Sequence, residues 1–248
     1  MKYQWILFDA DDTLFHFDAF KGLERLFSRY GVTFTEQDFQ DYQRVNKPLW
    51  GDYQAGKITA KQLQERRFTV WADRLQVTPQ TLNTGFLTAM ADICALLPGA
   101  QTLINGLKDK VNLGIITNGF TQLQTIRLQK MGLLDIFSLV VISEEVGLAK
   151  PHVGIFEYAF EKIRQKGLQG TEPLDLSRIL MVGDTQSSDI KGGMNVGIDT
   201  CWLNRFDEPL AEGVRPTYQI NSLLELKTLL ANLSDNTGSA DSTQNIAS

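Results

Sequence analysis

Two aspartates separated by a single residue are the first candidates for chemistry in this chain. Asp9 and Asp11 directly follow a short apolar run, residues 3–8, that is typical of a buried strand. The extended chain leaving such a strand would direct one carboxylate at a substrate and place the other at its flank. This spacing suits a nucleophile and a general acid or base. The alternative is a solvated acidic turn.

Polar groups that suit an anionic substrate follow two further apolar runs. Thr117 and Asn118 stand at the end of the run 111–117, before Gly119, so a hydroxyl and free backbone N–H groups could hold phosphate oxygens there. Lys150 precedes a proline, which keeps it out of helical geometry and could aim its ammonium at the same edge. The alternatives are an ordinary Asn-Gly turn and a surface lysine.

A second pair of carboxylates, Asp184 and Asp189, follows the apolar run 179–182. An N-cap of the next helix is the alternative for Asp184. Four carboxylates gathered at one edge would repel one another unless a hard divalent cation lay among them, and oxygen-only ligands favour Mg²⁺ over Zn²⁺. The cation, Lys150, Thr117 and the backbone amides could then bind a phosphoryl group, which is the arrangement that phosphoryl transfer requires.

Five short apolar runs separated by helical patterns must position these side chains. Their alternation predicts an α/β fold with a doubly wound parallel sheet, Rossmann-like, in which the carboxyl ends of the strands meet along one edge and ligands bind. The runs are residues 3–8, 111–117, 139–143, 179–182 and 200–203.

Residues 15–97 interrupt the alternation, because they contain no strand-like run and have the periodicity of four amphipathic helices. Thr35, Thr59 and Thr78 are placed to cap the second, third and fourth of them. This insertion is too long for a simple crossover and is interpreted as an all-helical cap domain. The chain is thus predicted to comprise a catalytic core of residues 1–14 and 98–233, a cap of residues 15–97 and a flexible polar tail of residues 234–248.

Composition and charge narrow the possible partners. The formal net charge is −5 and 43% of the 248 residues are hydrophobic, as in ordinary globular proteins. Mild acidity argues against a nucleic acid polymer or an anionic membrane surface as partner. Cys94 and Cys201 are far apart and are expected to be reduced thiols, and no signal peptide or membrane span is evident, so a cytoplasmic location is expected.

Taken together, the motifs resemble those of the haloacid-dehalogenase-like (HAD) phosphatases, and the helical insertion resembles that superfamily's C1-type cap. The resemblance covers residues 1 to about 233. It implies that Asp9 is a nucleophile forming an aspartyl-phosphate, and that Asp11 protonates the leaving oxygen and then activates water. It further implies Mg²⁺ held by Asp9, the Asp11 backbone carbonyl and Asp184, with Asp189 behind them orienting Lys150 or a metal-bound water. The four motifs are Asp9-x-Asp11-x-Thr13, Thr117, Lys150-Pro151 and Gly183-Asp184-x4-Asp189.

The presence of Asp11 also indicates which reaction a protein with these motifs catalyses. Expulsion of halide needs no proton, so dehalogenase relatives lack the second carboxylate, whereas an alkoxide leaving group needs an acid. A phosphomutase keeps both carboxylates and remains an alternative, as does a phosphatase acting on a small sugar phosphate. A phospho-accepting signalling domain would carry these groups in another order and without an inserted cap. A binding protein with a dead site would not need intact acidic residues and Lys150.

A finer resemblance is to the YjjG-type pyrimidine 5′-nucleotidases, which implies hydrolysis of pyrimidine and deoxypyrimidine nucleoside monophosphates. Five cap residues could stack on or hydrogen-bond a base, although aromatic residues at helical spacing usually pack, and a core role is expected for most of them. Arg127 and Arg205 are expected to be dispensable for phosphate binding beside Lys150, and Asp12 is expected to face solvent or an amide. The matching stretches are residues 8–15, 45–50, 115–120 and 142–147, and the cap residues are Phe15, Phe17, Asn46, Trp50 and Tyr53.

Overall fold

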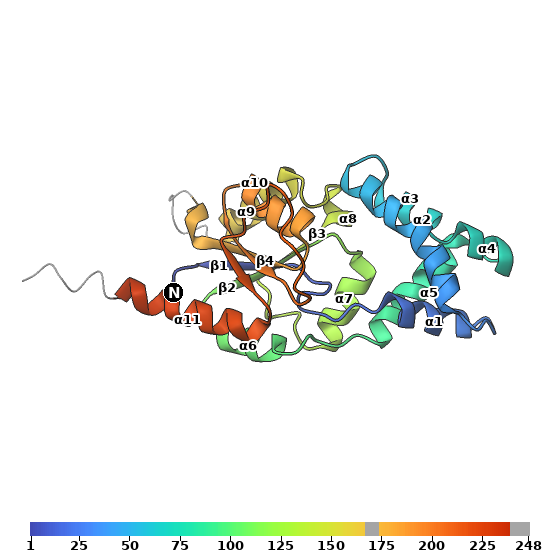
Figure 1. Cartoon of the computed structure of the whole chain (residues 1–248), viewed down its shortest axis with the longest axis horizontal. Coiled ribbons are helices and arrows are strands. Elements are labelled where there is room, and N and C mark those ends of the chain that lie inside the picture. The colour runs from blue at the N-terminus through green and yellow to red at the C-terminus, as the bar shows by residue number, and fades with distance from the viewer. Residues whose placement is uncertain (167–173, 239–248) are drawn as a thin grey trace, which may run out of the picture.

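A single sheet of six parallel strands forms the centre of the molecule (Figure 1). The computed structural model describes residues 1–166 and 174–238. The strand order β3-β2-β1-β4-β5-β6 places the first strand in the middle, and this confirms the predicted doubly wound α/β fold. The strands are β1 (Trp5–Phe8), β2 (Asn112–Thr117), β3 (Leu139–Ile142), β4 (Ile179–Gly183), β5 (Asp199–Leu203) and β6 (Tyr218–Ile220).

Strand β6 was not expected from the sequence. It is only three residues long and its central Gln219 is exposed, so it has no apolar run. Its place is determined by backbone pairing with β5, in which Cys201 lies opposite Tyr218. A short, half-exposed edge strand of this kind depends on its neighbour and leaves little local pattern.

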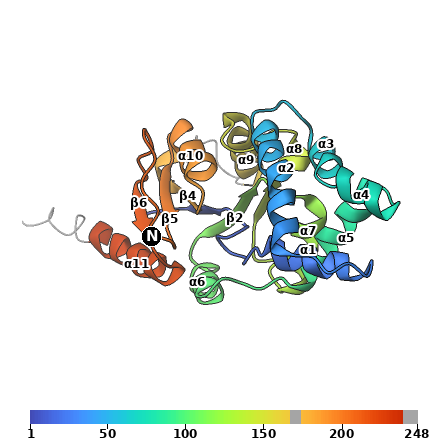
Figure 2. The ribbon, with the colours of Figure 1, turned by 45° about the vertical axis from the view of Figure 1, so that its right-hand side comes forward.

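Helices cover both faces of the sheet, which explains why β1 is apolar throughout. Ile6 and Phe8 belong to the core under α6 (Ala100–Leu107) and α11 (Leu223–Gly238). Trp5 and Leu7 belong to the opposite core under α9 (Val153–Lys166). Figures 1 and 2 show α6 and α11 on one side of the sheet and α9 and α10 (Lys191–Asn195) on the other.

Short segments complete the core near the strand ends. Helix α7 (Thr121–Lys130) follows β2, and α8 (Ser143–Val146) follows β3. A 3₁₀ turn η1 (Leu176–Arg178) precedes β4, and a π-helical turn η2 (Gln186–Ile190) follows it. No helix in the part of the chain that the structure describes is both long and apolar enough to cross a membrane.

The inserted segment forms five helices at one end of the molecule (Figure 2), and their hydrophobic cluster also includes Phe120, Leu123 and Ala149 from outside the insertion. Thr35, Thr59 and Thr78 each accept a hydrogen bond from a backbone N–H in the first turn of α2, α3 and α5, so the predicted caps are confirmed. The helices are α1 (Ala19–Ser28), α2 (Glu36–Gln54), α3 (Ala60–Arg66), α4 (Thr69–Leu75) and α5 (Pro79–Asp92).

The prediction of four helices in the insertion is wrong, because the third breaks at Arg67 and Phe68. On one continuous helix, Phe68 and Trp71 would share one face, but Leu63, five residues before Phe68, would point about 140° away from Phe68. The break lets all three side chains enter the same core, while Val70 remains 55% exposed.

The expected flexible tail begins within a helix, and its flexibility stays a prediction. Residues 234–238 continue the α11 helix, and each residue added to an existing helix gains a backbone hydrogen bond without a new nucleation cost. The rest of the expected tail, residues 239–248, lies outside the described residues. The division into a core of residues 1–14 and 98–233 and a cap of residues 15–97 stays a prediction.

Candidate active site

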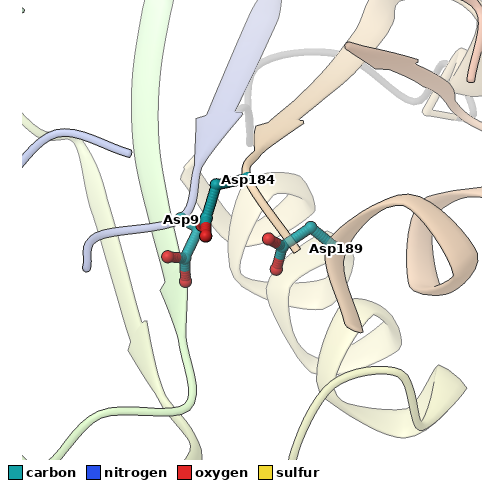
Figure 3. Close-up of side chains that lie close together, drawn as sticks. All are labelled: Asp9, Asp184 and Asp189. Atoms are coloured by element: carbon teal, nitrogen blue, oxygen red, sulfur yellow. The ribbon is translucent and has the colours of Figure 1, made fainter. Parts of the chain in front are cut away.

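The polar residues singled out in the sequence gather at the carboxyl edge of the sheet. Phe8 pairs with Ile115 of β2 and with Val182 of β4, so the three central strands end at the same level. Asp9 therefore lies beside Asp184, and Asp189 faces both from η2 (Figure 3). One oxygen from each of these three carboxylates lies within 4.8 Å of the others.

Lys150 joins this cluster from the loop that follows α8. Its side chain is 0% exposed, and Nζ lies 2.6 Å from Asp9 Oδ1, 2.7 Å from Asp189 Oδ1 and 2.6 Å from the Ile116 carbonyl oxygen. Asn118 holds the backbone of Lys150 in place, because its side chain donates to the Lys150 carbonyl at 2.9 Å and accepts from the Lys150 N–H at 2.8 Å. The surface-lysine alternative is therefore excluded.

The side chains of Thr117 and Asn118 have local partners that bear on their predicted contact with phosphate. Thr117 is 1% exposed, and its Oγ1 accepts from the Gly119 N–H at 3.0 Å. Since both polar ends of the Asn118 side chain bond Lys150, a contact between Asn118 and phosphate would fall to its backbone N–H. Both residues border the cavity above Asp9.

Crowding of like charges raises two carboxyl pKa values. Burial, together with the neighbouring Asp189, Asp184 and Asp11 carboxylates, raises the pKa of Asp9 well above its usual value, although the Lys150 ammonium opposes the change. Burial and then the charge of Asp189 raise the pKa of Asp184 to about 7. Burial alone would lower the pKa of Lys150, but the Asp189 and Asp9 carboxylates raise it, so its ammonium stays charged.

The donor set of this cluster fits a hard divalent cation. The three gathered side chains all offer carboxylate oxygens, and burial together with their mutual repulsion raises the pKa values of Asp9 and Asp184, an effect that a bound cation would oppose. The two oxygens of Asp189 already bond Lys150 at 2.7 Å and the Thr185 N–H at 3.0 Å. The Asp184 oxygens accept from neutral hydroxyls, Thr13 Oγ1 at 3.1 Å and Thr185 Oγ1 at 3.3 Å, so we expect Asp9 and Asp184 to be the better placed ligands.

Arg127 was expected to be dispensable for phosphate binding, and the structure gives it a different partner, Asp11, which was not predicted. Arg127 is 2% exposed and its Nη1 donates to Asp11 Oδ1 at 2.5 Å, so it holds the second aspartate rather than reaching for phosphate. Gln124 Oε1 accepts from Arg127 Nε at 2.9 Å, and the Phe15 ring lies 4.2 Å from the guanidinium carbon. The buried face of α7 combines these polar residues with Leu123 and Leu128. The sequence signal for this contact is the presence of Gln124 and Arg127 at positions of α7 where the helical periodicity predicts buried apolar residues.

The expectation for Asp12 is confirmed in part, because its side chain is 35% exposed and accepts a hydrogen bond from the Phe17 backbone N–H, but it also has a charged partner. Asp12 Oδ1 accepts from Arg205 Nη2 at 2.9 Å, which also gives Arg205 a partner other than phosphate. Asp12 has a φ of +55°, and its N–H donates to the Phe15 carbonyl at 2.7 Å, closing a tight turn after Asp11. The turn brings Thr13 beside Asp184, whose N–H donates to Thr13 Oγ1 at 3.1 Å.

A cavity of about 240 Å³ lies between the carboxylates and the inserted helices. Asp9, Asp11, Thr117 and Lys150 border one end of it, and side chains of the insertion border the other. This volume is below the ~300–1,000 Å³ typical of sites for drug-sized ligands, so the cavity suits a small one. The bordering residues of the insertion include Phe17, Tyr42, Asn46, Trp50, Arg67 and Phe86.

The five cap residues divide between packing and cavity. Phe15 is 0% exposed, and the buried Tyr53 donates from its hydroxyl to Ser143 Oγ at 2.7 Å. Phe17 and Trp50 pack against the hydrophobic cluster of the inserted helices and also border the cavity, as does Asn46, so the expectation that most of the five pack in the core is confirmed. The break between α3 and α4 adds Arg67 to the cavity wall, a residue that the sequence analysis did not single out.

The fold and the carboxylate cluster match a known class of enzymes. Residues 3–197 match the haloacid dehalogenase-like hydrolase family, and the chain belongs to that family. It is therefore a HAD-like hydrolase, with the phosphatase motifs set out above.

Relatives with known activities narrow the class. The chain is 56% identical to the pyrimidine 5′-nucleotidase YjjG of Escherichia coli over 230 residues, which cover 93% of this chain and 99% of that protein. It is 32% identical to the pyrimidine 5′-nucleotidase PynA of Streptococcus pneumoniae, over 91% of this chain and 94% of that one. This similarity supports a nucleotide phosphatase.

A solved structure agrees with the fold and bears on the metal. The HAD-hydrolase YfnB of Bacillus subtilis, solved bound to magnesium, superposes with a TM-score of 0.79 at 32% identity. The match covers 93% of this chain and 99% of that one, and interdomain movement was observed in YfnB. A carboxylate cluster that fits a divalent cation is thus present in a chain whose structural relative holds magnesium.

Proposed function

We propose that this hydrolase removes the phosphate group from pyrimidine nucleoside 5′-monophosphates, with Mg²⁺ as cofactor. The observation that carries the proposal is the cavity, which joins the Asp9 cluster at one end to aromatic and amide side chains at the other. Such a shape suits a phosphate attached to a small planar base. The 56% identity to a pyrimidine 5′-nucleotidase over nearly the whole chain supports this substrate class.

In the proposed reaction, Asp9 attacks the phosphorus atom while the bond to the 5′-oxygen breaks. Asp11, held by Arg127, donates its proton to the departing oxygen, so that the nucleoside leaves as a neutral alcohol. Asp11 then takes a proton from water, which attacks the phosphorus of the aspartyl-phosphate and restores Asp9 with release of inorganic phosphate. Asp9 is thus the nucleophile, and Asp11 acts first as general acid and then as general base.

The charged groups around Asp9 are arranged for this chemistry. Lys150 and Thr117 would bind the phosphoryl oxygens together with the backbone N–H of Asn118. Asp9, Asp184 and the backbone carbonyl of Asp11 would hold Mg²⁺, and Asp189 would orient Lys150. The cation supplies positive charge that offsets the carboxylates and the developing charge on the phosphoryl group.

A substrate screen tests the proposed function. With Mg²⁺ present, uridine, deoxyuridine and cytidine monophosphates should have kcat/KM values at least about 10-fold above those of purine monophosphates and small sugar phosphates, since one lost hydrogen bond to a charged group costs about that factor. Release of inorganic phosphate provides the measurement. Faster turnover of sugar phosphates than of any nucleotide would contradict the proposal and leave a HAD phosphatase of another specificity.

Binding of Mg²⁺ can be tested by thermal unfolding, without an activity measurement. Mg²⁺ at about 100 times its Kd should stabilise the folded chain by about 2.7 kcal/mol, and each kcal/mol corresponds to about 2–4 °C in melting temperature. Asp184→Asn should remove most of this shift, because it removes a ligand. Without Mg²⁺ the variant should melt at the same temperature or higher, because it relieves repulsion with Asp189.

The matched control for this experiment is Asp109→Asn, since Asp109 is exposed and outside the cavity. It should keep the full Mg²⁺-dependent shift. Retention of the full shift by Asp184→Asn would refute the assignment of Asp184 as a ligand.

We also propose a cytoplasmic location. Cys94 and Cys201 are both free thiols, which suits a reducing compartment. Burial raises the pKa of Cys201 to about 12, so its thiol stays protonated and unreactive.

A further inference from the structure

Arg67 places a buried positive charge at the end of the cavity remote from Asp9. The residue is 5% exposed, and its guanidinium carbon lies 5.1–5.3 Å from the ring centres of Phe68, Phe86 and Phe120. Among the residues that the structure describes, no carboxylate forms an ion pair with it; the groups that interact electrostatically with it are the Tyr42 hydroxyl and the Glu144 carboxylate. A buried cation without a direct counterion is costly, so its retention in a cavity wall calls for a ligand.

A chain of amides holds this guanidinium in a single orientation. Arg67 Nε donates to Asn83 Oδ1 at 3.1 Å, and Nη2 donates to the same oxygen. Asn83 Nδ2 donates to Gln64 Oε1 at 3.0 Å, and Gln64 Nε2 donates to Glu144 Oε1. All of the dipoles point the same way, from the cation toward the carboxylate, so the arrangement is cooperative.

The far end of this chain is anchored in the core. Glu144, at the start of α8, also accepts from the Thr121 N–H at 2.8 Å. The position of the guanidinium in the inserted helices is therefore tied to two core helices beside the sheet edge. A guanidinium that is fixed in this way is suited to recognising a ligand atom at a defined position in the cavity.

Arg67 borders the cavity and carries more donors than Asn83 accepts from. A guanidinium has five N–H groups; Asn83 takes two, and the Tyr42 hydroxyl interacts with the group as well. Lys150, at the other end of the cavity, serves the phosphate. An acceptor for Arg67 must therefore come from the part of the substrate that reaches toward the inserted helices.

We propose that Arg67 is a specificity-determining residue that donates to the 2-carbonyl oxygen of a pyrimidine base. This inference rests on the proposed function. Uracil, thymine and cytosine all carry this oxygen, whereas adenine has no carbonyl, and a planar guanidinium binds acceptors on the edge of a base well. Phe17 and Trp50, which border the same cavity, offer aromatic surface for the ring.

The test compares Arg67→Met with Arg66→Met, using uridine monophosphate and ribose 5-phosphate as substrates. Met keeps an apolar stem among the three phenylalanines but donates no hydrogen bond, and Arg66 is the exposed neighbour on the same helix. Arg67→Met should lower kcat/KM for uridine monophosphate about 10–100-fold, mainly through KM, and change that for ribose 5-phosphate less than about 3-fold. Arg66→Met should leave both substrates within about 2-fold.

A second comparison separates recognition from a merely structural role. The 5′-monophosphate of a phenyl C-nucleoside has a ring of the same size without any acceptor. The kcat/KM of the wild-type enzyme for this analogue should be about 10–100-fold below that for uridine monophosphate. In Arg67→Met the kcat/KM values for the two compounds should be nearly equal. Arg67→Lys, which keeps the charge and some donors, should lie between the two and serves if the Met variant does not fold.

Three results would overturn the inference. Equal losses on uridine monophosphate and ribose 5-phosphate would show that Arg67 only supports the fold, and no loss on either would show that it does not read the base. Undiminished discrimination against the phenyl analogue in both Arg67→Lys and Arg67→Met would also show that Arg67 does not recognise the base. If the wild-type enzyme does not prefer pyrimidine monophosphates, the proposed function itself fails, and that result is visible without any variant.

Discussion

Asp9→Asn should lower kcat for nucleoside monophosphates by at least about 10⁴-fold, as loss of a catalytic nucleophile does in other hydrolases. The amide that replaces the carboxylate has nearly the same volume but cannot form the acyl phosphate. KM should change much less, because Lys150 and the amides that bind the phosphate remain. Steady-state release of inorganic phosphate checks the loss, and trapping of labelled phosphate on the protein checks the missing intermediate.

The fold should tolerate this substitution. Burial and three neighbouring carboxylates raise the pKa of Asp9, so removal of its charge relieves both desolvation and repulsion. Lys150 keeps its bonds to Asp189 and to the Ile116 carbonyl. The melting temperature without Mg²⁺ should thus be equal to or higher than that of the wild-type protein.

The control is again Asp109→Asn, which makes the same chemical change at an exposed site and should retain full activity. Turnover of Asp9→Asn at a rate near that of the wild type would disprove the role of Asp9 as nucleophile. Loss of activity accompanied by loss of folding would be recognised by the melting curve, and Asp9→Glu, which keeps the charge but displaces it, would then serve as the second variant.

Asp11→Asn should lower kcat by about 10²–10⁴-fold for nucleotides, the usual contribution of a general acid or base. The loss should be smaller for para-nitrophenyl phosphate, because its leaving group needs no proton. Arg127 can still donate to the amide oxygen, so the side chain should keep its position. The measurement is kcat for both substrates in a single preparation.

Hydrolysis of the aspartyl-phosphate should also slow, since Asp11 activates the water. With para-nitrophenyl phosphate, Asp11→Asn should therefore show a burst of nitrophenol, followed by a slow steady state. Equal losses for the two leaving groups would refute acid catalysis by Asp11, and the absence of a burst would refute its role in the second step. Asp109→Asn again provides the control.

Arg127 adds a positioning element to the second aspartate. It approaches Asp11 from α7, is supported by Gln124, and packs on the Phe15 ring of the turn that follows Asp11. Both partners of the ion pair thus belong to segments that carry other site residues. The Arg127–Asp11 ion pair thus links the Asp9-x-Asp11-x-Thr13 motif to α7, the helix that follows Thr117.

The arrangement of the site along the sheet edge could be predicted from the sequence. Asp9, Lys150, Asp184 and Asp189 meet because parallel strands in a doubly wound sheet present their carboxyl ends at one edge. The threonine caps of the inserted helices were equally accessible, since a cap and its hydrogen-bond partner lie within a few residues of each other. The residues that define a strand end or a helix cap all lie within a short stretch of chain, so the sequence shows these features directly.

Contacts between distant segments could not be predicted in the same way. Arg127 bonds a carboxylate 116 residues away, and Arg205 bonds one 193 residues away. Each arginine can reach several groups, and the packing of its own element selects among them. The break at Arg67 likewise depends on the core that receives Phe68, so no local pattern marks it.

By itself, then, the amino-acid sequence determined the class of fold, the identity of the acidic and basic groups at the sheet edge and the phosphatase chemistry that they allow. Only the tertiary structure decided which arginine holds Asp11, which one faces the remote end of the cavity, and which aromatic residues of the insertion border it. The physical reason is that strand and helix patterns are set by neighbours along the chain, whereas the partner of a long charged side chain is set by helices brought together from distant segments.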